Sequence, residues 1–135
     1  VVANELVSDP IKVKVLPLDE VLSGESPSLI KIDVEGLETL VINGMICTLG
    51  NASLHSVITE LNGSGRQYGF DDRDIIKTMR EFGFQMYRYE PFERALQPVS
   101  SKDTTSSNML FLRNEDFIRS RLTNAPCVQI GFHEI

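Results

Sequence analysis

The sequence contains few cysteines and histidines, and this scarcity excludes several kinds of site. Cys47 and Cys127 are too few for a disulfide framework or for a cysteine-based zinc site. We expect both to be small buried hydrophobic residues. His55 and His133 have no cysteine or histidine neighbour at the spacing of metal ligands. These residues therefore predict no metal site.

Positive charge and long apolar runs are also scarce. The chain carries 13 Lys and Arg residues against 19 Asp and Glu residues, a net charge of −6. This balance argues against a nucleic acid or a membrane surface as the partner, because both are bound through clustered positive charge. No apolar run approaches the ~20 residues that a membrane span needs. Residues 1–5 lack the basic and apolar regions of a signal peptide, so we expect the protein to be located in the cytoplasm.

The sequence does contain enough apolar residues for one core. Hydrophobic residues make up 41% of the 135 residues, and no linker divides them, so residues 1–135 are expected to form a single domain. Apolar and β-branched runs predict strands at 11–15, 28–34, 55–61, 85–89 and 108–112. Most of these runs lack clean alternation, which is typical of strands covered on both faces.

Helix signals lie between these strands. Apolar residues at helical spacing predict helices at 37–43, 72–82 and 115–122. A left-handed Gly44 should end the first helix, and Gly83 should end the second. Asp71 or Asp72 is expected to cap the start of the second helix, and Asn114 the start of the third. Alternating strands and helices predict an α/β fold, a three-layer Rossmann-like architecture with a mostly parallel sheet. The last two strands have no helix between them. They are predicted to form an antiparallel hairpin at the sheet edge, with a long polar loop.

Acidic and amide side chains gather where two of the predicted strands end. Asp33 and Glu35 follow one strand, and Glu60 and Asn62 lie at the end of the next. In open α/β sheets, ligands bind outside these carboxyl ends. Residues 33 and 35 of an extended strand share a face, so their carboxylates suit a general base, a hydrogen-bond acceptor or a pair of ligands for a divalent cation. Each acid also has a structural interpretation, as a residue of a helix's first turn or as a solvated charge.

The glycine-rich segment 62–69 offers an alternative site. Its G-x-G-x-x-x-G spacing follows a strand, so its backbone amides could approach a phosphate, with Glu90 as a partner for ribose. The spacing is loose, however, and the next helix begins only near Asp72, which favours a flexible loop over the site. Lys31 lies inside an apolar run and is interpreted structurally, as a partner of a neighbouring acid or as an edge residue whose ammonium reaches water.

Three motifs in this region combine into a specific pattern. The sequence L-D-E at 18–20 is followed by I-K-I-D-V-E-G-L-E at 30–38 and by V-I-N-G at 41–44. With these motifs the chain resembles the FkbM-type methyltransferases over about residues 13–114, leaving 115–135 as a C-terminal helix and tail. The resemblance implies a class I fold and an S-adenosylmethionine-dependent enzyme. It also implies methyl transfer to a hydroxyl of a small-molecule acceptor, a sugar or natural product.

The resemblance also implies roles for individual residues. Residues 33–36 match the family's D-V-E-G turn after the fourth strand, which faces the transferred methyl group and the acceptor. Asp33 and Glu35 are therefore the implied catalytic residues, and Asp33 and Val34 the implied cofactor contacts. Glu60 matches the acid of the fifth strand, and with Asn62 it is assigned to acceptor binding.

The first strands of that fold, with the glycine-rich turn that holds most of the cofactor, have no counterpart in this sequence. We therefore expect a partial domain that is inactive alone and doubtful in cofactor binding. The strand at 29–34 would then present an open edge, through which we expect self-association. Two alternatives stay open: a non-catalytic α/β binding or interaction module, and a nucleotide-binding module that uses Gly63–Gly69.

Overall fold

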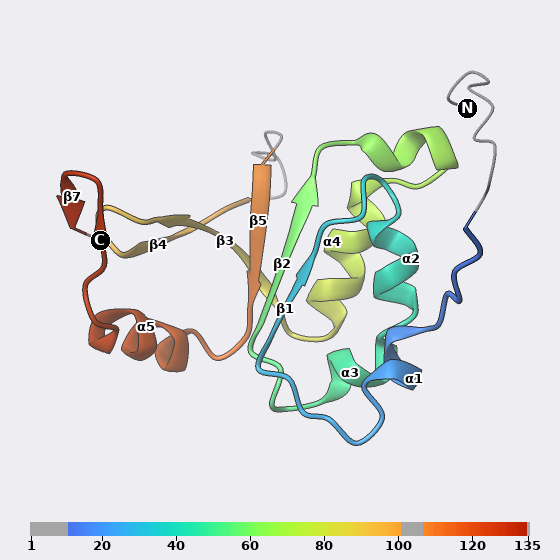
Figure 1. Cartoon of the computed structure of the whole chain (residues 1–135), viewed down its shortest axis with the longest axis horizontal. Helices are drawn as coiled ribbons and strands as arrows, with labels where there is room; N and C mark the ends of the chain where they lie inside the picture. The colour runs from blue at the N-terminus through green and yellow to red at the C-terminus, as the bar shows by residue number, and fades with distance from the viewer. Residues whose placement is uncertain (1–10, 101–106, 135) are drawn as a thin grey trace.

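Five strands form one sheet in the computed structural model, which describes residues 11–100 and 107–134 (Figure 1). In order across the sheet they are β1 (Leu29–Ile32), β2 (Ser56–Leu61), β5 (Ser107–Leu112), β3 (Gln85–Glu90) and β4 (Ala95–Pro98). Only β1 and β2 pair in parallel, and the other three pairs of this sheet are antiparallel. The expectation of a mostly parallel sheet is therefore wrong. The reason is that β3 turns directly into β4, and β5 returns between β2 and β3, so neighbouring strands run in opposite directions.

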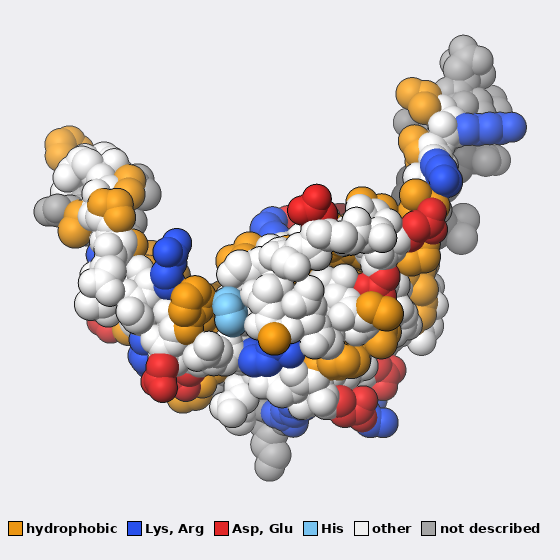
Figure 2. Space-filling model, turned by 90° about the horizontal axis from the view of Figure 1, so that it is seen from below, with side chains coloured by type: hydrophobic (Ala, Val, Ile, Leu, Met, Phe, Trp, Pro, Cys, Tyr) orange, Lys and Arg blue, Asp and Glu red, His pale blue; other side chains and the backbone are white. Residues whose placement is uncertain are grey.

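The two ends of the sheet also differ from the expectation. β3 and β5 do pair antiparallel, with Gln85 opposite Leu112, but β5 lies inside the sheet and the unpredicted β4 forms the edge. The segment before α1, expected to be a strand at 11–15, forms none. Ile11 and Val15 are 88% and 87% exposed there, because no described strand lies beside them. Figure 2 shows this segment projecting from the body of the molecule.

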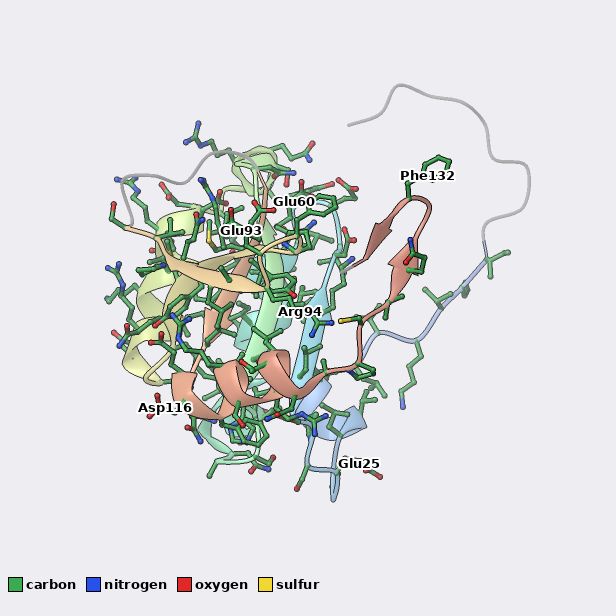
Figure 3. All side chains as sticks on the ribbon, turned by 90° about the vertical axis from the view of Figure 1, so that its left-hand side faces the viewer. Glu25, Glu60, Glu93, Arg94, Asp116 and Phe132 are labelled. Carbon is green, nitrogen blue, oxygen red and sulfur yellow. The ribbon has the colours of Figure 1, made fainter. Side chains whose placement is uncertain are left out.

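Helices cover both faces of the sheet and make three layers, as expected (Figures 1 and 3). One face carries α2 (Glu38–Asn43), α3 (Ile46–Gly50) and α4 (Asp72–Glu81), with α1 (Leu18–Val21) beside α3. The other face carries α5 (Glu115–Asn124), which is followed by a small hairpin of β6 (Gln129–Ile130) and β7 (His133–Glu134). In the described part of the chain, no helix has the length and apolar character needed to cross a membrane.

The sheet separates two cores of unequal size, and β5 contributes alternate side chains to both, Phe111 to one and Leu112 to the other. Val57 and Leu61 belong to the larger core, which fills the space between the sheet and α2–α4. The smaller core joins Leu112 and its strand neighbours to Ile118 and Leu122 of α5. The fold therefore packs one face of the sheet fully and covers the other face by a single helix.

Helix ends follow the predicted signals only in part. The Asp71 side chain caps α4 by accepting a hydrogen bond from the backbone N–H of Arg73 at 2.9 Å, as predicted. Gly83 follows α4 with φ 83°, also as predicted. Gly44 is not left-handed, because its φ is −83° and the chain continues almost directly into α3. Asn114 adopts the left-handed conformation itself, and its side chain caps no amide.

The two cysteines are exposed, so the expectation that they are buried is wrong. Cys47 lies on α3 and Cys127 in the segment after α5. Their residue type favours burial, but neither position faces a core.

Arg113 joins three segments at the end of β5. Its Nε and Nη2 donate to the carbonyl of Leu54 at 3.2 and 2.7 Å, and its Nη1 donates to the carbonyls of Leu49 at 3.1 Å and Phe82 at 3.3 Å. The guanidinium carbon also lies 4.6 Å from the centre of the Phe84 ring. Burial lowers the pKa of Arg113. This side chain therefore satisfies the last carbonyls of α3 and α4 and fixes them against the start of β2.

Candidate functional site

The turn after β1 holds the predicted site residues Asp33, Val34 and Glu35, all of them exposed. Glu35 has φ 50° and Gly36 has φ 93°, two successive residues in the left-handed region. The carboxylate of Asp33 accepts a hydrogen bond from the ammonium of Lys31 at 2.5 Å. This contact agrees with the interpretation of Lys31 as a partner of a neighbouring acid. Because both side chains are about half exposed, the ion pair contributes at most about 1 kcal/mol of stability.

A buried carboxylate, Glu38, holds this turn in place. Its side chain is only 6% exposed, and Oε1 accepts hydrogen bonds from the backbone N–H groups of Gly36 at 3.2 Å and Val34 at 3.4 Å. Charge-assisted hydrogen bonds of this kind are stronger than those between neutral groups. Sequence reasoning missed this role. The one signal was the place of Glu38 at the end of the motif I-K-I-D-V-E-G-L-E.

Gly36 also brings the turn against the segment that follows β2. A Cβ atom at Gly36 would lie 2.9 Å from the carbonyl carbon and oxygen of Ser64, a distance that Cβ contacts do not adopt. Gly65, on the other side of this contact, would place a Cβ atom 3.3 Å from the carbonyl oxygen of Gly36. Two glycines therefore let two loops touch through their backbones.

The parallel pairing of β1 with β2 places two of the predicted acids on neighbouring strands. Ile32, the last residue of β1, lies opposite Thr59, so Asp33 directly follows β1 and Glu60 is the next residue of β2. Glu60 in turn lies opposite Asn108 of β5. Figure 3 shows Glu60 at the upper end of the sheet. The carboxyl end of β1 therefore lies beside the part of β2 that carries Glu60.

Glu35 is placed differently from the expectation. The argument that residues 33 and 35 share a face assumed an extended strand, but β1 ends at Ile32 and the backbone turns left-handed at Glu35. Glu35 therefore lies at the tip of the turn and does not share a strand face with Asp33.

The glycine-rich segment after β2 forms a short 3-10 helix, η1 (Ser64–Tyr68), instead of an irregular loop. Its amides are largely engaged within the protein. Gly63 donates to the Asp72 carboxylate at 2.9 Å, Ser64 donates to Oδ1 of Asn62 at 2.8 Å, and Gly69 donates to the carbonyl of Arg66 at 3.0 Å. A phosphate cradle needs such amides free. This geometry therefore does not favour the nucleotide-binding interpretation, and it gives Asn62 a role in shaping the loop.

The carboxyl ends of β1 and β2 present exposed carboxylates. Within residues 11–100 and 107–134, no three His, Cys, Asp or Glu side chains are close enough together to hold a metal ion. Glu35 and Glu60 make no ion pair with another described residue. These carboxylates are therefore suited to accept hydrogen bonds from hydroxyl groups and to attract a positively charged ligand.

Comparison with known proteins identifies one family. The domain described as Methyltransferase FkbM domain matches residues 3–86, more than half of the chain. The matched region includes β1, the Asp33–Gly36 turn, β2 and α4, and it ends within β3. Neither the search of curated proteins nor the search of solved structures found a match.

Proposed function

Since the chain belongs to the FkbM methyltransferase family, we propose that the carboxyl ends of β1 and β2 form part of a site for S-adenosylmethionine-dependent O-methylation. The acceptor would be a small molecule with a hydroxyl group, a sugar or natural product. One observation carries this proposal. Asp33 and Glu60 follow neighbouring positions of parallel strands, at the end of the sheet where α/β proteins bind their ligands.

The described residues fit one end of the proposed cofactor. When bound, S-adenosylmethionine supplies an electrophilic methyl group on a positively charged sulfur. The carboxylates of Asp33 and Glu60 suit the neighbourhood of such a charge, and Val34 lies exposed beside Asp33. The amides of Gly63, Ser64 and Gly69 are engaged elsewhere, so that loop offers no cradle for the adenosine end. We therefore expect residues 1–135 alone to bind the cofactor weakly and to be inactive.

Asp33 is the residue proposed to move a proton. Its carboxylate would accept the hydrogen bond of the acceptor hydroxyl and take its proton as the oxygen bonds to the methyl carbon, while the bond between the methyl carbon and the sulfur breaks and a neutral thioether leaves. The ammonium of Lys31, 2.5 Å from the same carboxylate, fixes its position and balances its charge. Glu35, Glu60 and Asn62 are proposed to bind other hydroxyl groups of the acceptor. Most of the rate then comes from holding the acceptor oxygen in line with the methyl group.

Replacing Asp33 by asparagine tests this role. Asp33→Asn keeps the size of the side chain and removes the proton acceptor, so any methyl transfer that this site supports should fall by about 100-fold or more. The rate is measured as transfer of a labelled methyl group to hydroxylated acceptors. Glu25→Gln, an exposed acid far from the turn in Figure 3, is the matched control and should leave the rate unchanged. Full activity in Asp33→Asn would remove Asp33 from the mechanism.

We also propose that the chain associates with itself through β1. In the described sheet β1 pairs on one side only, with β2, and Leu29 on it is 54% exposed. A short strand with an open edge and an exposed apolar residue offers unpaired backbone groups to a second chain. The proposed partner is the same strand of a second copy.

A further inference from the structure

We propose that the groove between α5 and the sheet binds an amphipathic carboxylate, a single aliphatic chain with an anionic head. The groove is separate from the Asp33–Gly36 turn. Its polar end is formed by Ser28 and Ser56, at the amino ends of β1 and β2, whereas Asp33 follows the carboxyl end of β1. Five residues of extended chain separate Ser28 from Asp33, a distance of about 16 Å. The inference therefore does not depend on methyl transfer.

The groove has the size of a small-molecule site. Its volume is about 570 Å³, within the range of roughly 300–1,000 Å³ that is usual for such sites. Its walls come from all five strands of the sheet and from α5. The apolar lining includes Ile58, Tyr89, Leu96, Leu110, Ile118 and Leu122. An aliphatic chain matches this lining, because burial of each methylene in such a space is favourable.

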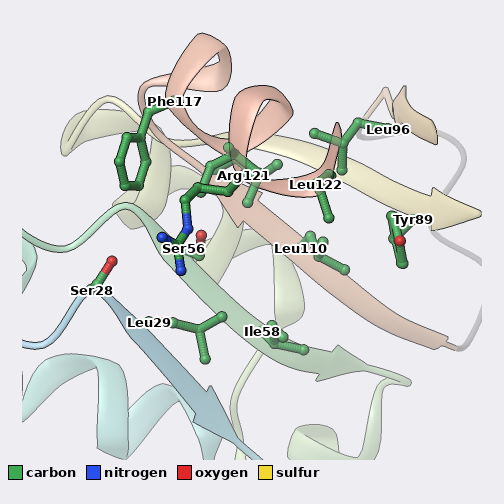
Figure 4. A pocket seen from close by; sticks show the side chains of 12 residues that line it. Ser28, Leu29, Ser56, Ile58, Tyr89, Leu96, Leu110, Phe117, Arg121 and Leu122 are labelled. Atoms are coloured by element: carbon green, nitrogen blue, oxygen red, sulfur yellow. The ribbon is translucent and has the colours of Figure 1, made fainter. Parts of the chain in front are cut away.

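The polar groups of the groove gather at one end. Figure 4 shows the Arg121 side chain reaching from α5 toward the sheet, with Ser28 and Ser56 at the same end. Ser56 is only 4% exposed, yet no described residue forms a hydrogen bond with its hydroxyl. Ser56 lines the groove, so its hydroxyl is placed to donate a hydrogen bond to a ligand there.

The charge at this end identifies the head of the ligand. Among the described residues, Arg121 makes no ion pair, in contrast to Arg119 on the same helix, which pairs with Glu115 at 2.5 Å. A guanidinium presents parallel N–H donors that match the two oxygens of a carboxylate. Two serine hydroxyls beside it add donors for the same group. A carboxylate therefore matches this end of the groove better than an alcohol or an amine does.

The position of α5 keeps the groove open. The Tyr87 hydroxyl of β3 donates to the Glu115 carboxylate at 2.5 Å, which fixes the first turn of α5 to the sheet. At the same end, the His55 and Phe117 rings are in contact, with 4.4 Å between their centres and a tilt of 41° between their planes. These contacts hold the start of the helix, and the groove extends beneath its later turns toward Leu122.

Titration calorimetry of the chain with octanoate, decanoate and 1-decanol tests the proposal. Below the concentration at which decanoate forms micelles, both carboxylates should saturate one site. Decanoate should bind about tenfold more tightly than octanoate, because two methylenes contribute about 1.6 kcal/mol and 1.4 kcal/mol corresponds to a factor of ten. 1-Decanol should bind about tenfold more weakly than decanoate, since it cannot pair with Arg121.

Two variants locate the site. Arg121→Gln should weaken decanoate about tenfold and leave 1-decanol unchanged, and Ser56→Ala should weaken decanoate by a smaller factor. Arg80→Gln, an exposed arginine on α4 across the sheet, is the matched control and should change neither affinity. The proposal is overturned by absence of saturable binding, by equal affinity for decanoate and 1-decanol, or by equal loss in Arg80→Gln and Arg121→Gln. Circular dichroism of each variant shows that the fold is retained.

Discussion

At the scale of single residues, the turn after β1 depends on a glycine that admits no side chain. Gly36 combines a left-handed φ of 93° with a backbone contact to Ser64. Glu38 holds the same turn from beneath through the amides of Val34 and Gly36. Within the motif D-V-E-G-L-E, Gly36 and Glu38 therefore shape the turn. The other two acids, Asp33 and Glu35, remain exposed for a ligand.

Gly36→Ala should destabilise the protein more than Gly24→Ala. Both glycines have positive φ, which costs an alanine about 1–2 kcal/mol. Gly24 has nothing within 4 Å of an added Cβ atom, whereas the Cβ atom at Gly36 would lie 2.9 Å from the backbone of Ser64. Steric strain should add about 1–3 kcal/mol to the cost at Gly36. Urea unfolding measures the difference, and equal losses would show that the two loops do not touch.

At the scale of the elements, the L-D-E motif has a physical explanation in α3. The Asp19 carboxylate accepts hydrogen bonds from the backbone N–H groups of Cys47 and Thr48, both at 2.8 Å, and from the Thr48 hydroxyl at 2.6 Å. Asp19 therefore caps α3 from α1, although 28 residues separate it from Cys47. Burial raises the pKa of Asp19, but the hydrogen bonds from Thr48 and Cys47 outweigh it and hold the pKa below its usual value.

Asp19→Ala should cost about 1 kcal/mol at neutral pH, the usual effect of a lost cap. Because the pKa of Asp19 is lower in the folded protein than in the unfolded chain, the cap stabilises above about pH 4. Its contribution is lost as the pH falls through the folded pKa. Urea unfolding of wild type and variant at pH 7 and pH 3 measures this. Glu20→Ala is the control, and a pH-independent difference for Asp19→Ala would contradict the cap.

The elements also show what a sequence can and cannot reveal. β2 and α4 were predictable, because an apolar β-branched run and apolar residues at helical spacing are local signals. β4 was missed, since Ala95–Pro98 has little strand character and forms by pairing with β3. Residues 11–15 have the alternation of a strand but no described neighbour to pair with. Pairing depends on distant parts of the chain, which local patterns do not contain.

The candidate site was predictable to a similar extent. Asp33 and Glu60 were visible because they lie at or near the ends of apolar runs, and the structure places Asp33 directly after β1 and Glu60 within the parallel strand β2. The contact between Gly36 and Gly65 was not visible, because it depends on how two loops meet in space. The groove beneath α5 was also missed, since its lining comes from six separate elements.

At the scale of the whole molecule, the two edges of the sheet differ in what they offer. β4 forms one edge and β1 the other. β1 pairs on one side only, with β2, and its Leu29 side chain is 54% exposed. An open strand with apolar surface beside it is a site for strand pairing.

Leu29→Lys should therefore shift the chain toward the monomer. A charge at the exposed position of β1 opposes edge-to-edge pairing, and lysine is the residue that natural edge strands use for this purpose. Gln97→Lys, at an exposed position of β4 on the other edge, should leave the association unchanged. Sedimentation equilibrium over a wide concentration range measures the effect. A wild-type monomer at every concentration would rule out the association.

The central claim is that the carboxyl ends of β1 and β2 receive the methyl donor. The most direct measurement is a nuclear magnetic resonance titration of the 15N-labelled chain with S-adenosylmethionine, because it detects and locates even millimolar binding. We predict concentration-dependent shifts of the amides of Val34, Glu35 and Gly36, together with those of Glu60 and Asn62. Shifts confined to Gly63–Gly69, or no shift at residues 33–36 at saturating cofactor, would contradict the claim.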